Sequence, residues 1–260
     1  MQNILYNVSN RKISFKAAHI TDIHIKDAQV AWQTRFPIFM NKLLNHDIDY
    51  VLNTGDTADN SSNTADATVE DFVADVNAVF PMITTRGNHD GSVTNAQLDM
   101  PSNYYYVDIN SKWRVIVLHS QGGGNYSLGA TQTTWLTDTL TATPSTQYVC
   151  IMSHVPFCSV AALMWYLRNG QGWSNTVDYH SDARAILDIV KLYPNIKVCL
   201  SGHEHTIDRV DHEGVVYLNS GAVSADWWNT SNYQEKGYPA GYRLIDFYDD
   251  GTIREQFLTY

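Results

Sequence analysis

Cysteine is scarce in this chain of 260 residues, and its few cysteines form no motif. Cys150, Cys158 and Cys199 make no CxxC pair and are odd in number, so no disulfide framework is indicated. No apolar stretch approaches the roughly 20 residues that a membrane span needs. The N-terminal residues also lack the layout of a signal peptide. We therefore expect a cytoplasmic protein that does not bind membranes.

Basic residues are outnumbered, with 17 Lys and Arg against 27 Asp and Glu and a formal net charge of -10. Extended nucleic-acid grooves are usually basic, so long nucleic acid is not an expected partner. Bound divalent cations would reverse the sign of the charge locally, so a small phosphate ester stays compatible with this composition. The glycines at 122–124 are followed by no lysine, which excludes a P-loop.

The length suits one domain with a substantial core, spanning residues 1–260 with a β-rich C-terminal part from about 206 to 260. Hydrophobic spacing predicts strands, polar loops and helices in alternation, which indicates an α/β fold. The expected strands are 13–20, 50–53, 80–83, 113–118, 148–152 and 196–200. The expected helices are 34–45, 69–80, 132–140 and 182–192. The expected hairpins pair 207–210 with 215–218 and 242–248 with 252–258.

Each cluster of His, Asp and Asn follows directly after a predicted strand. In open α/β sheets, ligands bind outside the carboxyl ends of the strands. We therefore expect five polar loops, distant in sequence, to converge on one edge. The residues concerned are Asp22, His24, Asp56, Asp59, Asn88, His89, His154, His203 and His205.

Taken singly, each cluster also has a plain structural interpretation. Gly87 to Gly91 would serve as a polar turn, and His154 alone would serve as a buried structural histidine. Together they favour a different interpretation, because imidazoles and carboxylates are preferred ligands of Mn, Fe and Zn. Two such metals bridged by a carboxylate form a recurrent clamp for in-line attack at phosphorus. That clamp needs roughly seven protein ligands, and the clusters supply them with one histidine left over.

The motifs D-x-H, G-D-x-x-D, G-N-H-D, a lone His and G-H-x-H, in this order over about residues 13–217, resemble the calcineurin-like metallophosphoesterase family. The resemblance implies a sandwich of two mixed β-sheets flanked by helices, in α/β/β/α layers. It also implies two divalent metal ions, Mn²⁺ or Fe first and Zn²⁺ as the alternative. By matching position, Asp22, His24 and His205 resemble the ligands of one metal, Asp56 the bridge, and Asn88, His154 and His203 the ligands of the second. His89 resembles the histidine that faces the substrate phosphate, and Asp59 the carboxylate that orients it.

A second pair of segments, Leu118-His119-Ser120-Gln121 and Gln132-Thr133-Thr134-Trp135-Leu136, resembles class III cyclic-nucleotide phosphodiesterases. The match departs at His119, where that branch usually has Asp. It implies a phosphodiesterase on cyclic nucleotides or related small diesters. A phosphomonoesterase or nuclease on the same centre and a non-catalytic, metal-stabilised binding module are the alternatives. His119, Trp227 and Trp228 are candidate substrate contacts, with plain packing as the alternative, and the sequence leaves the oligomeric state open.

Overall fold

The computed structural model describes residues 11–25, 30–59, 63–91, 93–168, 179–225, 227–228 and 238–260. Its elements follow one another along the chain as β1 (Ile13–Ile20), α1 (Val30–Leu44), β2 (Tyr50–Asn53), α2 (Asn63–Asn77), β3 (Met82–Thr84), β4 (Tyr105–Asp108), β5 (Trp113–Val117), α3 (Gly129–Ala142), β6 (Tyr148–Met152), α4 (Ala161–Arg168), α5 (Ala183–Val190), β7 (Ile196–Ser201), β8 (Asp208–His212), β9 (Val215–Asn219), β10 (Gly241–Tyr248) and β11 (Ile253–Thr259). No helix in the described ranges is long and apolar enough to cross a bilayer.

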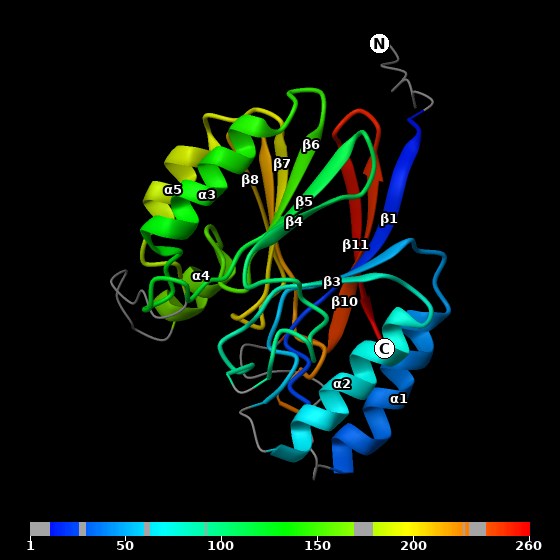
Figure 1. Ribbon diagram of the computed structural model, residues 1–260. Helices are drawn as coiled ribbons and strands as arrows, with labels where there is room; N and C mark the ends of the chain where they lie inside the picture. Colours follow the sequence, from blue (N-terminus) through cyan, green and yellow to red (C-terminus); the bar gives the residue numbers. More distant parts are fainter. Residues whose placement is uncertain are drawn as a thin grey trace, which may run out of the picture.

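The strands form two mixed sheets that pack face to face (Figure 1). One sheet has the order β11-β10-β1-β2-β3, in which β1, β2 and β3 are parallel and β10 is antiparallel to β1. The other has the order β4-β5-β6-β7-β9-β8, in which β5, β6, β7 and β9 are parallel. The β-rich C-terminal part therefore supplies strands to both sheets.

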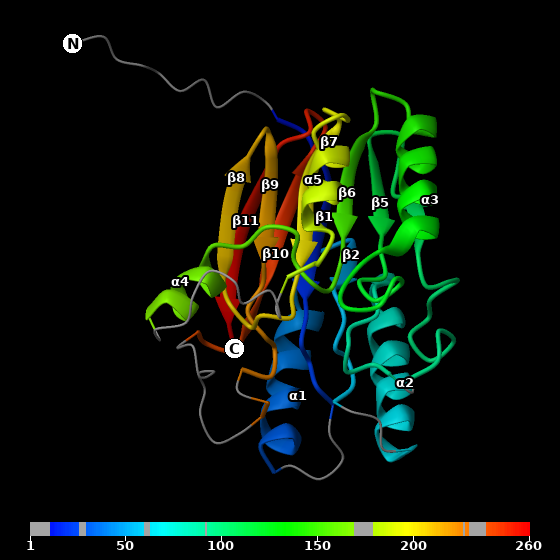
Figure 2. The ribbon, with the colours of Figure 1, turned by 90° about the vertical axis from the view of Figure 1, so that its left-hand side faces the viewer.

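Apolar side chains on both faces of the strands build the layers, because successive side chains of a strand point to opposite faces of the sheet. In β1, Ala17 joins the core between the two sheets, whereas its neighbour Ala18 joins the core beneath α1 and α2. In β5, Val115 faces the core between the sheets, whereas Ile116 packs under α3 and α5. Figure 1 shows α3 and α5 on one side of the sandwich and α1 and α2 on the other, and Figure 2 looks onto the side that α3 and α5 cover. The expected α/β/β/α architecture is confirmed.

The expected elements differ from the structure in several places. Helix α2 begins six residues before position 69 and ends three residues before position 80. Helix α1 begins four residues before position 34 and continues through Pro37, since Phe39 and Leu43 beyond it are fully buried against the sheet. Strand β4 was not expected, because it is an edge strand whose alternate residues are exposed. Helix α4 was not expected either.

Candidate metal centre

The candidate site lies where the parallel strands of both sheets end. Residues after β1, β2 and β3 come from one sheet, and residues after β6 and β7 come from the other. Backbone hydrogen bonds tie the first two loops together, from the N–H of Asp22 to the carbonyl of Gly55 (3.0 Å) and from the N–H of His24 to the carbonyl of Asp56 (2.9 Å). The expected convergence of the polar loops on one edge is present.

Asp22, His24 and His205 form the first cluster, and all three are buried. The Nε2 atoms of His24 and His205 lie 3.1 Å apart, and Nε2 of His205 lies 3.3 Å from Oδ1 of Asp22. Burial lowers the pKa of His24 well below its usual range, so its ring is neutral. A neutral imidazole is the form of histidine that binds a metal.

Asp56, His154 and His203 form the second cluster. Nε2 of His154 lies 3.2 Å from Oδ2 of Asp56 and 3.0 Å from Oδ1 of Asn88. The rings of His154 and His203 are 5.1 Å apart. Burial lowers the pKa of His203 to about 3, so this ring too is neutral near pH 7.

Asp56 lies between the two clusters. Its Oδ2 is 3.9 Å from Nε2 of His24 on one side and 3.2 Å from Nε2 of His154 on the other. Burial alone would raise the pKa of Asp56, but His154 and His24 outweigh it and lower that pKa to about 2. An ionised carboxylate is therefore held between two groups of histidines.

The donor set at His154 fits a cation. Nδ1 of this ring faces the carbonyl oxygen of Thr54 at 2.8 Å, so the proton of a neutral ring belongs on Nδ1. Nε2 would then turn its lone pair toward the oxygens of Asp56 and Asn88. Without a cation, a second proton on the ring removes this repulsion between the lone pair and the oxygens. Burial lowers the pKa of His154, but the Asp56 carboxylate outweighs burial and raises that pKa to about 9. A divalent cation among these three donors would take the place of the proton on Nε2.

His89 and Asp59 lie beside these clusters. Nδ1 of His89 is 3.4 Å from Oδ1 of Asp59, and the same oxygen is 3.8 Å from Nδ1 of His24. The His89 side chain is 19% exposed, whereas His24 is fully buried. These distances would also let His24, Asp59 and His89 hold an ion.

Backbone strain is concentrated in these loops. Positive φ angles, uncommon outside glycine, occur at Asp22 (51°), His24 (50°), Asp56 (50°), His203 (69°) and His205 (52°). Strained residues of this kind tend to collect at functional sites, where the surrounding structure enforces them.

The turn after β3 can take no side chain at Gly87. A Cβ added there would lie 2.1 Å from Oδ1 of Asp56. Asp90 holds this turn in place, since Oδ2 accepts from the N–H of Gly87 and Oδ1 from the N–H of Ala58, both at 2.8 Å. Sequence reasoning gave Asp90 no part in the site. An Asp two residues after Asn88 was the available signal, because short carboxylates often bond nearby backbone N–H groups.

Trp227 and Trp228, the two tryptophans expected to contact the substrate, have different surroundings. Trp227 packs on the site histidines, with ring-centroid distances of 3.9 Å to His24, 4.8 Å to His89 and 5.2 Å to His205. Trp228 is 1% exposed and donates from Nε1 to the carbonyl of Ile23. A buried indole offers no surface to a substrate, so the expected substrate contact at Trp228 is replaced by its alternative, packing.

His119 lies outside the clusters, at the end of β5. The neighbouring Leu118 donates from its N–H to the carbonyl of Met152 (2.9 Å), which places His119 beside the segment that carries His154. His119 lines a pocket next to the clusters.

Comparison with known proteins agrees with this geometry. Residues 15–206 match the family described as calcineurin-like phosphoesterase. The chain is 26% identical over 216 residues to the 3',5'-cyclic adenosine monophosphate phosphodiesterase CpdA of Escherichia coli, covering 80% of this chain and 73% of that protein. It is 23% identical over 263 residues to a 3',5'-cyclic-nucleotide phosphodiesterase of Nostoc, covering 94% and 91%.

Solved structures share the fold at low sequence identity. A dimetal phosphatase from Danio rerio superposes with a TM-score of 0.65 at 14% identity, covering 96% of this chain and all of that one. A purple acid phosphatase from yellow lupin gives a TM-score of 0.58 at 14% identity, covering 95% of this chain and 53% of that one. With the family match over most of its length, this chain belongs to the calcineurin-like phosphoesterase family.

Proposed function

We propose that this protein hydrolyses small phosphodiesters, with 3',5'-cyclic nucleotides as the first candidates, at a centre of two divalent metal ions. The observation that carries the proposal is the position of the Asp56 carboxylate between His24 and His154. A carboxylate so placed suits a bridge between two ions. Asp22, His24 and His205 would complete one ion's ligands, and Asn88, His154 and His203 the other's.

The donor types favour Mn²⁺ or Fe, with Zn²⁺ as the alternative, because imidazole and carboxylate suit all three. When bound, such a pair of ions lowers the pKa of a water molecule and neutralises charge that develops on the phosphoryl oxygens. The protein's own contribution is to fix the donors in place. The backbone bonds between the β1 and β2 loops serve this purpose.

His89 is the proposed proton donor. As the water oxygen forms its bond to phosphorus, the bond from phosphorus to the ester oxygen breaks. The departing oxygen then takes a proton from His89. Asp59, 3.4 Å from Nδ1 of His89, would keep the proton-bearing Nε2 turned toward the leaving group. The partial exposure of His89 supports this role, because a substrate must reach it.

The names of the curated relatives support a diesterase over the alternatives. A phosphomonoesterase or nuclease would use the same centre, since substrate choice within one fold depends on the surrounding loops. A non-catalytic binding module would have no use for His89 beside Asp59. The acidic net charge of -10 gives no support to a long nucleic acid as substrate.

The test is a substrate panel on protein reconstituted separately with Mn²⁺, Fe²⁺ or Zn²⁺. Bis-p-nitrophenyl phosphate, p-nitrophenyl phosphate and 3',5'-cyclic AMP are compared by kcat/KM, and metal-stripped protein is the control. We expect both diesters to be cleaved faster than the monoester. Equal or faster turnover of the monoester would replace the diesterase with a monoesterase. If the protein binds two ions and hydrolyses none of the esters, the non-catalytic binding module is the remaining function.

A further inference from the structure

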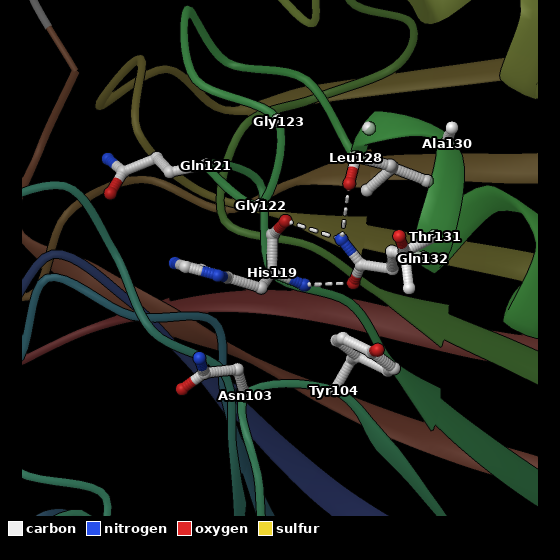
Figure 3. A pocket seen from close by; sticks show the side chains of 11 residues that line it. Asn103, Tyr104, His119, Gln121, Gly122, Gly123, Leu128, Ala130, Thr131 and Gln132 are labelled. Atoms are coloured by element: carbon white, nitrogen blue, oxygen red, sulfur yellow. Dashed lines mark hydrogen bonds between the residues drawn. The ribbon is translucent and has the colours of Figure 1, made fainter.

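A pocket lies beside the proposed metal centre. It has a volume of about 590 Å³ and lies between the end of β5, the start of α3 and the segment before β4. Figure 3 shows Asn103, Tyr104 and Gln121 arranged around His119. Small-molecule sites usually measure roughly 300–1,000 Å³, so the pocket is large enough for an organic group.

Hydrogen bonds join this pocket to the loops of the metal centre. The hydroxyl of Thr85, just before the turn of Asn88, donates to the carbonyl of Leu118 (2.6 Å). On the other side, the N–H of Val155, which follows His154, donates to Oγ of Ser120 (3.1 Å). His119 therefore lies between two segments that carry proposed ligands.

The glycine-containing loop that follows continues this connection. Gly122 and Gly123 line the pocket, and Tyr126 further along packs its ring 5.0 Å from the ring of His203. One loop thus borders both the pocket and the second metal cluster. A ligand with its phosphate at the metals could extend its organic part into the pocket.

The lining is polar but carries no formal charge. Its residues are Asn103, Tyr104, His119, Gln121, Gly122, Gly123, Leu128, Gly129, Ala130, Thr131 and Gln132. Burial, reinforced by the nearby Arg86 guanidinium, lowers the pKa of His119, so the imidazole is neutral. With no Lys or Arg in the lining, the pocket suits an uncharged group with hydrogen-bonding edges and does not suit a phosphate.

Some polar groups of the lining are already engaged. Gln132 accepts from the N–H of His119 (2.7 Å) and donates to its carbonyl (2.9 Å), which fixes the backbone there. Oδ1 of Asn103 accepts from Asn95 (3.0 Å), whose own Oδ1 accepts from Arg86 (2.8 Å). Asn103 is thereby oriented with its amide N–H₂ available to donate.

Other groups are available to a ligand. Within the described part of the chain, the Gln121 amide makes no side-chain hydrogen bond, so it offers a donor and an acceptor. Tyr104 is partly exposed and its ring is supported by a tilted contact with Trp135, with ring centroids 4.9 Å apart. A supported aromatic ring beside two carboxamides matches a planar heterocycle, because amides pair with base edges and aromatic rings stack on base faces.

We propose that this pocket binds the nucleobase of a nucleotide diester whose phosphate lies at the metal centre, with Tyr104 as the stacking face and Asn103 and Gln121 as contacts to the base edge. The inference rests on the proposed function for its substrate, and it makes these three residues specificity determinants. Loss of a base–aromatic stack would reduce kcat/KM by about five- to hundredfold.

The experiment compares Tyr104→Ala and Gln121→Ala with the wild type on 3',5'-cyclic AMP and on bis-p-nitrophenyl phosphate, which has no base. Tyr106→Ala is the matched control, because Tyr106 is 46% exposed on β4 and stacks on Arg114 instead. We expect the Tyr104 and Gln121 variants to lose far more on the nucleotide than on the baseless diester, mainly through KM. The Tyr106 variant should match the wild type on both.

A second readout does not depend on hydrolysis. Adenosine, uridine and ribose are titrated into metal-stripped protein by calorimetry, and Tyr104→Ala should weaken nucleoside binding while ribose stays weak throughout. Equal losses on both diesters, or ribose binding as well as adenosine, would overturn the nucleobase pocket while leaving diester hydrolysis intact. If the wild type cleaves no diester, the proposed function fails, and the titration alone decides whether the pocket takes a base.

Discussion

The backbone N–H of His89 donates a hydrogen bond of 2.7 Å to Oδ1 of Asp56. The other carboxylate oxygen of Asp56 faces His154 and His24. One side chain therefore connects both proposed metal positions with the turn that carries the proposed proton donor. A change at Asp56 should affect metal binding at both positions, and a change at a residue of one cluster should affect one.

The first prediction follows from that position. Wild-type protein reconstituted with Mn²⁺ should hold about two ions per chain, as expected for a bridged pair. Asp56→Asn, which keeps the size and removes the charge, should reduce this below about one. His154→Ala should retain about one. Elemental analysis of gel-filtered protein measures the content, and an unchanged value in Asp56→Asn would exclude the bridge.

The second prediction separates catalysis by His89 from metal binding. His89→Ala should keep the wild-type metal content and lose roughly 10²–10⁴-fold in kcat on an alkyl diester, the usual contribution of one positioned proton donor. The loss should be smaller on bis-p-nitrophenyl phosphate, because p-nitrophenolate leaves without protonation. Asp59→Asn should show the same pattern more weakly. Loss of an ion in His89→Ala would instead assign His89 to the set formed with His24 and Asp59.

The third prediction uses the adjacent tryptophans as a matched pair. Trp228→Ala should lower the free energy of unfolding by roughly 3–5 kcal/mol, the usual cost of removing a buried tryptophan, because Trp228 is 1% exposed in the core beneath α1 and α2. Trp227→Ala should change stability much less and alter turnover, since Trp227 covers His24 and His89. Urea unfolding and diester kinetics on both variants check this. Reversed effects would mean that Trp227 is the packing residue.

The fourth prediction concerns pH and stability at His19, whose ring nitrogens lie 2.9 Å from the hydroxyls of Thr54 and Ser220. Burial, with repulsion from Arg243, lowers the pKa of His19 to about 3 in the folded protein. In the unfolded chain the pKa of His19 is near 6.5, so between about pH 6.5 and 3 the unfolded chain binds a proton at His19 that the folded chain does not bind. Stability from this residue is therefore present above about pH 6.5 and is lost as the pH falls toward 3.

One such proton changes the free energy of unfolding by at most about 1.4 kcal/mol per pH unit. His19→Gln, which removes the titrating group, should flatten the fall in stability between pH 7 and pH 5. Urea unfolding of metal-stripped protein at three pH values measures the slope. His212→Gln is the control, because the His212 side chain is 54% exposed. A slope in His19→Gln equal to that of wild type would show that His19 does not contribute.

Much of the fold was predictable because the buried parallel strands have plain sequence signals. The runs at Tyr50–Asn53 and Tyr148–Met152 are apolar, short and followed by polar residues, and the structure gives β2 and β6 the same bounds. Strand β4 has no such signal, since Tyr106 and Asp108 face solvent. The expected helix 34–45 contains Pro37, and packing of the residues beyond the proline keeps the helix continuous through it.

The grouping of the site residues was predictable from one rule, that polar loops follow strand ends. Their individual surroundings were not. Trp227 and Trp228 are adjacent and identical in type, and only the three-dimensional path of the chain turns one toward His24 and the other into the core. The contact of Tyr126 with His203 also depends on a loop path that no local pattern specifies.

The left-handed backbone at Asp22, His24, Asp56, His203 and His205 has a consequence for the evolution of such proteins. Each strained residue costs the fold on the order of 1–3 kcal/mol, and glycine or asparagine would adopt the same conformation more easily. Selection for metal binding would keep histidine and aspartate at these positions despite their cost in stability. In a descendant released from this selection, glycine and asparagine should spread first through these positions. The lineage would then gain thermal stability as it lost its chemistry.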